Sequence, residues 1–206
     1  MKNTIYNYVS YFRRLAAEHH AILHDPQQET QAATIRGARR FVLFDTDEVV
    51  TGLRTQIGDG IVLFLEAYTF QGHDNDAGDY RSQHQGRFIV AKKYNVKSFY
   101  DLVYAYDECE KVTWDFINRL IFDSSVDGTA CGTPFKNLSL ANFSCDPVDK
   151  LWDNRAGWLV EFRFEQSRID AINADNATDT NIWQLYTPPY PTDLPPLETD
   201  FTQPAP

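Results

Sequence analysis

Residues 157–166 read GWLVEFRFEQ, and the second half of this stretch alternates apolar with charged side chains. The two alternating sets are Trp158, Val160, Phe162 and Phe164 on one side and Leu159, Glu161, Arg163 and Glu165 on the other. A period of two residues is typical of a β-strand with one face in the core and one in solvent. We therefore expect a strand here whose Trp158, Phe162 and Phe164 face the helices of the domain.

A first hairpin is predicted earlier in the chain. Residues 61–70 (IVLFLEAYTF) are typical of a strand that is buried on much of both faces. Residues 87–93 (RFIVAKK) are expected to return as its partner. The polar residues 71–86 predict a connector of the hairpin type, long enough to project from the body.

A second hairpin is predicted near the end of the domain. Residues 138–145 are expected to pair with residues 157–166 around a loop at 146–154. The apolar run RFVLF at 40–44 is interpreted either as a short strand or as part of the following turn.

Three stretches have the i, i+3, i+4 spacing of apolar residues that predicts amphipathic helices. They are residues 4–24, residues 45–57 and the long stretch 96–123. Combined with the two hairpins, they predict an α+β domain, with an antiparallel sheet of two hairpins packed against two or three helices.

Residues 170–206 differ in composition from the domain predicted at 1–169. They contain no Lys or Arg, six acidic residues and seven of the ten prolines of the chain. Because proline lacks a backbone N–H and has a fixed φ, this stretch predicts an extended, acidic, proline-rich arm. Its aromatic residues are of types that anchor interfaces, and we expect them to dock on the same domain or on a neighbouring subunit: Trp183, Tyr186, Tyr190 and Phe201.

Charge argues against one class of partner, and the lack of a long apolar stretch argues against another. Lys and Arg total 19 and Asp and Glu total 29, which gives a formal net charge of −10. A general nucleic-acid binder needs dense basic residues to displace phosphate counterions, so no specific nucleic acid is expected. No stretch approaches the roughly 18 apolar residues of a membrane span, so no membrane is expected either.

The sequence contains no motif that predicts catalysis. His20 and His24 are four residues apart, but no Glu stands between them as in a zinc hydrolase helix. The loop at 73–79 lacks the glycine and the final acid that an EF-hand requires at fixed positions. We expect reduced thiols outside any zinc site, and no enzyme, cofactor or metal ion; the cysteines are Cys109, Cys131 and Cys145.

One combination of elements is similar to a known class of protein. After an N-terminal amphipathic helix come the strand VLFLEAYTF (62–70), the strand RFIVAKKY (87–94), a long helix with YDECEKVTWDFINRLIFD (106–123) and the strand RAGWLVEFRF (155–164). This order resembles the small α+β proteins of tailed-bacteriophage structural operons, in particular the tail-terminator and neck (head-tail joining) type. The resemblance covers residues 1–168, and its most characteristic part is the closing Gly-Trp-aliphatic-x-Phe element that begins at Gly157.

The resemblance implies a non-enzymatic structural subunit whose function is carried by interfaces. Such a subunit forms a homo-oligomeric ring, with a hexamer as the expected form, that terminates the tail tube or joins it to the connector. The implied partners are copies of the chain itself and tail-tube or connector proteins. The implied location is the virion, after assembly in the host cytoplasm.

The residues leave two other classes of function as alternatives. A pocket between sheet and helices would define a small-ligand or peptide-binding module, with a lining drawn from Tyr68, Tyr94, Tyr104 or Trp158. A metal-dependent hydrolase that uses His20 and His24 is the other class, although no complete set of ligands accompanies them.

Overall fold

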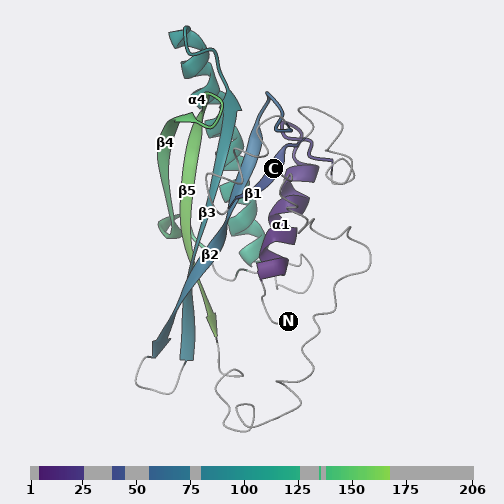
Figure 1. The fold of residues 1–206 in the computed structure, drawn as a ribbon. Coiled ribbons are helices and arrows are strands. Elements are labelled where there is room, and N and C mark those ends of the chain that lie inside the picture. Colours follow the sequence, from purple (N-terminus) through teal and green to yellow (C-terminus); the bar gives the residue numbers. More distant parts are fainter. Residues whose placement is uncertain are drawn as a thin grey trace, which may run out of the picture.

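The computed structural model describes residues 5–25, 39–44, 56–74, 80–125, 135 and 138–167. The described elements, in chain order, are α1 (Ile5–Glu18), β1 (Phe41–Phe44), β2 (Val62–Asp74), β3 (Tyr80–Lys93), α4 (Phe99–Ser125), the 3₁₀ turn η1 (Leu140–Asn142), β4 (Phe143–Leu151) and β5 (Arg155–Ser167). They form one five-stranded sheet in the order β1-β2-β3-β5-β4, with α1 and α4 packed against it (Figure 1). The predicted α+β class is therefore confirmed.

The sheet joins the two expected hairpins through their long strands β3 and β5, which pair antiparallel along 13 residues of β5. β1 adds to the edge of β2 in parallel, so the sheet is mixed and not purely antiparallel. The open interpretation of residues 40–44 is thereby settled as a strand. A parallel neighbour requires a long crossover, and the chain between β1 and β2 supplies one.

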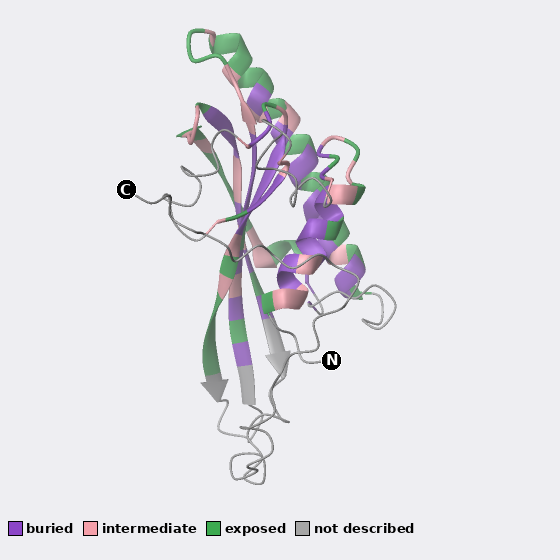
Figure 2. Cartoon of the chain, turned by 45° about the vertical axis from the view of Figure 1, so that its right-hand side comes forward, coloured by how far each residue is buried: buried purple, intermediate pink, exposed green. Residues whose placement is uncertain are grey.

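The main core lies between the sheet and the two helices. Its buried residues come from α1, α4 and one face of the sheet, and they include Tyr8, Phe12, Leu63, Phe88, Cys109, Phe116, Leu120, Val160, Phe162 and Phe164. Trp158 is partly buried against the same cluster. The expectation that Trp158, Phe162 and Phe164 face the helices is therefore confirmed. Figure 2 shows buried positions in both helices and along the strands beside them.

The two helices are also joined by a buried polar contact. The Tyr11 hydroxyl on α1 donates a 2.8 Å hydrogen bond to Asp123 on α4, and Arg119 Nε donates to the same carboxylate at 2.8 Å. Asp123 is fully buried, so both partners compensate for the cost of burying its charge. Burial, followed by the bond to Asp123, raises the pKa of Tyr11, which therefore remains a donor across the physiological range.

α1 ends at Glu18, six residues before the predicted end at residue 24. Leu23 adopts a left-handed φ of 51°, and the His24 N–H donates back to Ala16 O at 3.1 Å. This turn places Ile22 in the main core. Ile22 is therefore buried although it lies after the helix, and its position in the sequence fits the helical spacing of apolar residues. The predicted helix at 45–57 lies almost wholly outside the described residues; Ile57 itself pairs with Arg39 in an isolated β-bridge.

The stretch 71–86 is a strand pair for most of its length, and the predicted connector was wrong. β2 continues to Asp74 and β3 begins at Tyr80, with cross-strand pairs as far as those two residues. This part of the hairpin runs beyond the helices (Figure 1), and its buried face carries the polar residues Ser82 and His84, whose side chains are hydrogen-bonded to each other at 2.7 Å.

The second hairpin is also tighter than predicted. β4 spans Phe143–Leu151 and not 138–145. The predicted loop 146–154 is therefore only a turn at 152–154. Three residues join the two strands, since Leu151 pairs with Arg155, and two of them, Asp153 and Asn154, have left-handed φ values of 62° and 58°. Asp and Asn tolerate this conformation better than other residues with a side chain.

Two of the cysteines differ in burial. Cys109 is fully buried, and its Sγ donates to Ala156 O at 3.7 Å, whereas Cys145 on β4 is exposed. Burial, with a smaller effect of Glu108, raises the pKa of Cys109 to about 12.

We predict that a chain retaining only Cys109, made by Cys131→Ser and Cys145→Ser, resists an aromatic disulfide reagent at about pH 8 until it is unfolded, because the thiolate is the reactive form. A chain retaining only Cys145 should react while folded. Equal rates in the two folded variants would show that Cys109 is not buried.

Candidate assembly surface

The first turns of α4 project beyond the end of the sheet. β3 ends at Lys93, and the chain then turns into the helix, with Ser98 Oγ accepting the Asp101 N–H at 3.2 Å as a cap. The first buried residue of α4 is Ala105; before it, Leu102 is half-buried and the other residues of the helix are exposed. Figure 1 shows this end of the helix standing clear of the strands.

The projecting end carries large apolar side chains in solvent. Phe99 and Tyr100 are each 73% exposed and Tyr104 is 63% exposed. We call this set, completed by Val96 and Val103, the α4 aromatic surface. Clustered exposed aromatics on a folded domain mark an interaction site. Figure 2 shows the tip of α4 as exposed.

The apolar spacing that predicts the helix at 96–123 includes Phe99 and Val103 and so predicts that both are buried, whereas the structure leaves them 73% and 45% exposed. The stripe that is buried begins at Ala105 and continues through Cys109, Val112 and Phe116. Nothing in the spacing of apolar residues shows where the neighbouring sheet ends, so the exposed start of the helix was missed.

A pocket of about 570 Å³ lies beside the α4 aromatic surface. It is lined by Asp59, Lys92, Lys93, Tyr94, Asn95, Asp101, Tyr104, Ala105 and Glu108. Two of the four aromatic residues predicted to line a pocket, Tyr94 and Tyr104, are brought together here. The other two are not, because Tyr68 packs edge-on against Tyr8 and Trp158 Nε1 donates to Tyr106 O at 3.1 Å.

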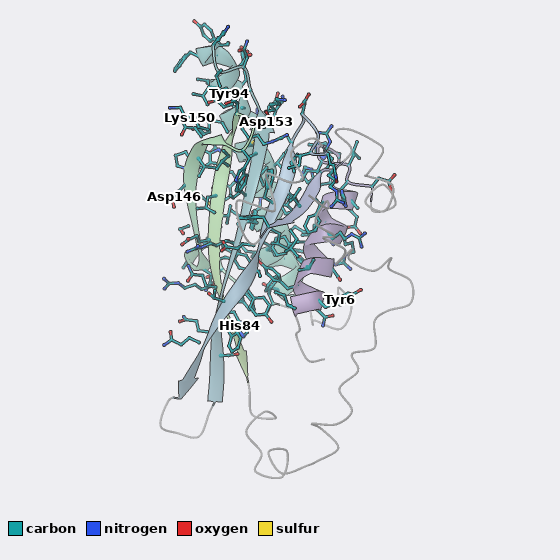
Figure 3. The ribbon with its side chains drawn as sticks, viewed as in Figure 1. Tyr6, His84, Tyr94, Asp146, Lys150 and Asp153 are labelled. Carbon is teal, nitrogen blue, oxygen red and sulfur yellow. The ribbon has the colours of Figure 1, made fainter. Side chains whose placement is uncertain are left out.

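Both lysines of the pocket are paired with carboxylates. Lys93 Nζ lies 3.1 Å from an Asp59 oxygen and 2.8 Å from an Asp153 oxygen, and Lys92 pairs with Glu108. Hydrogen bonds to Asp153 and then to Asp59 raise the pKa of Lys93. Figure 3 shows Tyr94 and Asp153 at this end of the sheet. The pocket therefore presents aromatic surface, two lysines that are already paired and one further carboxylate, Asp101.

The opposite end of the sheet carries a second aromatic group. Phe70 on β2 is 66% exposed, and its ring centroid lies 5.7 Å from that of His84 on β3. His84 is buried and stacks on Phe164 at 4.8 Å, and Figure 3 shows it where the long hairpin leaves the helices. The domain thus presents aromatic residues at both ends of its sheet.

The outer edge on the β4 side is poorly suited to strand addition. β4 carries Pro147, which cannot donate a ladder hydrogen bond, and the exposed charges Asp146, Asp149 and Lys150. Figure 3 shows Asp146 and Lys150 along this strand. Prolines and charges of this kind prevent edge-to-edge pairing.

The residues considered for a metal site do not share a helix face. His20 is exposed and stacks on His19 at 4.8 Å, whereas His24 is buried with its ring 5.7 Å from that of Phe41. Because α1 ends at Glu18, before both histidines, their four-residue spacing does not place them on one face of a helix. Within the described ranges, no group of three or more His, Cys, Asp or Glu residues is placed to hold a metal ion.

The predicted interface residues of the arm lie outside the described residues, and for them the prediction stays a prediction; they are Trp183, Tyr186, Tyr190 and Phe201. Neither α1 nor α4, the two α-helices in the described part of the chain, has the length and apolar character needed to cross a membrane. No protein-family model matches the sequence, and a search of curated proteins finds no significant match.

Proposed function

We propose that this protein is a non-enzymatic structural subunit that assembles into a ring in a bacteriophage tail or neck. The observation that carries the proposal is the α4 aromatic surface, which leaves Phe99, Tyr100 and Tyr104 in solvent at one end of the sheet. A second aromatic group at Phe70 marks the other end. Different surfaces at the two ends favour head-to-tail contacts between copies. Such contacts form a closed ring when the rotation from one subunit to the next adds up to a full turn.

The order of the elements supports the phage assignment in the same way as the sequence resemblance. A hairpin, a long helix and a second hairpin follow one another, and the closing strand carries the Gly157-Trp158 element. The proposed partners are copies of the chain and tail-tube or connector proteins, in the virion, with assembly in the host cytoplasm. The net charge of −10 suits a ring through which DNA passes without binding.

A second candidate function is a peptide or small-ligand binding module. The observation in its favour is the pocket that contains Tyr94 and Tyr104. Its volume of about 570 Å³ falls within the range of pockets that hold small ligands. The two functions differ in the oligomeric state that they require.

We predict that the full-length chain sediments as a closed oligomer, with a hexamer near six times the 23.7 kDa of one copy. Tyr100→Glu should shift the distribution toward monomer, because it places a charge in the aromatic contact. Phe122→Glu, at a 61% exposed position on the far end of α4, serves as the matched control. Sedimentation velocity measures all three. A monomeric wild-type chain would contradict the ring and favour the binding module.

A further inference from the structure

We propose that the pocket beside the α4 aromatic surface binds the proline-rich segment at residues 187–197 of a neighbouring copy. This inference rests on the proposed assembly into a ring and names the contact that links its subunits. The segment reads TPPYPTDLPPL and contains five prolines in eleven residues.

The chemistry of the segment predicts how it is recognised. A run this rich in proline favours the polyproline II conformation, which makes no internal backbone hydrogen bonds and exposes its carbonyl oxygens. Such segments dock in grooves lined with aromatic side chains, where rings pack against prolines and nearby donors reach the carbonyls. Because the prolines restrict the chain before binding, docking costs little conformational entropy.

The pocket offers the matching groups. Tyr94 and Tyr104 line it, and Tyr100 stands beside it on the same helix. Asn95 uses its Oδ1 to accept the Lys97 N–H at 3.1 Å, which leaves the side-chain amide group of an exposed residue as a donor. Aromatic faces with a neighbouring amide donor are the groups that a polyproline II segment requires.

The charges of the pocket favour a nearly neutral occupant. Lys92 and Lys93 are already paired with Glu108, Asp59 and Asp153, so no uncompensated cation attracts a polyanion. Asp193 is the only charged residue in the segment 187–197, whereas the rest of the arm carries five acidic residues. Within the arm, this segment is therefore the part best suited to the pocket.

The positions of the two partners favour a contact between copies. Lys93, at the pocket, pairs with Arg155 at the start of β5, whereas Ser167 ends β5 at the hairpin end of the sheet. These ends are separated by roughly 40 Å of strand. The chain thus leaves β5 at the end of the domain opposite the pocket, which is an arrangement that suits contacts between identical copies head to tail. The 19 residues between Ser167 and Thr187 can extend to about 60 Å, enough to reach a neighbouring pocket.

The test uses the full-length chain with the photoreactive amino acid benzoylphenylalanine in place of Tyr190. Copies labelled with ¹⁴N and ¹⁵N are mixed, unfolded and refolded together, and then irradiated. We expect cross-links from position 190 to peptides within residues 92–108, with both isotopes present in the share of linked pairs that random mixing of the copies gives. Tyr104→Ala should lower the yield by about tenfold or more, because a central aromatic anchor is lost. Phe122→Ala, which removes an equally exposed ring from the far end of α4, should leave the yield unchanged.

Three results would overturn the inference: linked pairs of one isotope only, linkage to another part of the domain, or an undiminished yield in Tyr104→Ala. Circular dichroism of the exposed-site variants establishes that they are folded. Sedimentation of the same samples tests the proposed function separately. An intact ring with cross-links elsewhere rejects only this docking site, whereas a monomer rejects the ring and, with it, the contact between copies.

Discussion

Replacing Gly157 by alanine is expected to lower the free energy of unfolding by about 3 kcal/mol or more. Gly157 on β5 is paired with Ala91 on β3, in the middle of the sheet. A Cβ atom added at Gly157 would overlap the Val90 carbonyl oxygen and lie 2.7 Å from the Ala91 Cα. Both neighbours are backbone atoms, so no change of rotamer relieves the overlap. The two central strands would have to separate, which breaks ladder hydrogen bonds and opens the core beneath them.

Gly72→Ala is the matched control, because Gly72 is also a strand glycine but has no atom within 4 Å of an added Cβ. Its free energy of unfolding should change by less than about 0.5 kcal/mol. Urea denaturation followed by circular dichroism compares the two variants. Similar midpoints would show that β3 and β5 do not approach each other closely at Gly157.

Phe162→Ala is expected to cost about 3–5 kcal/mol of stability. The side chain is fully buried, with ring centroids of Phe135 and Phe143 at 5.4 and 5.7 Å. It occupies the space opposite Gly86, where an added Cβ would lie 2.6 Å from the Phe162 ring. Truncation therefore leaves a cavity walled by other large side chains, which cannot collapse into it.

The control for this variant is Phe122→Ala, because Phe122 is 61% exposed and its loss opens no cavity. Its effect should stay within about 0.5 kcal/mol. Both variants are compared by urea denaturation. A loss below about 1 kcal/mol in Phe162→Ala would mean that this face of β5 is not the one in the core.

Local patterns predicted the buried face of β5 because charged residues alternate with the aromatic ones along its second half. They were insufficient for the stretch 71–86, where β2 and β3 continue with polar residues on both faces. On β3 the buried positions of this stretch are occupied by Ser82, His84 and Gly86, so this strand has no hydrophobic period. Its pairing comes from the backbone ladder, which the side-chain pattern does not reveal.

The candidate site was predictable only in part. Tyr94 and Tyr104 meet at one pocket, as an aromatic lining between sheet and helix predicted. Tyr68 and Trp158 have similar chemistry but pack toward the core. Their separation depends on which end of the sheet each residue occupies, and residue type carries no information about that.

The sequence by itself determined the α+β class, the two hairpins, the long helix and the core-facing set on β5, because each depends on a period of two or 3.6 residues. Only the tertiary structure decided that β1 joins in parallel, that α1 stops at Glu18 and that α4 leaves its first aromatic residues in solvent. The physical reason is that burial depends on where the neighbouring element ends. α4 begins beyond the end of the sheet, so the same apolar spacing is core after Ala105 and open surface before it.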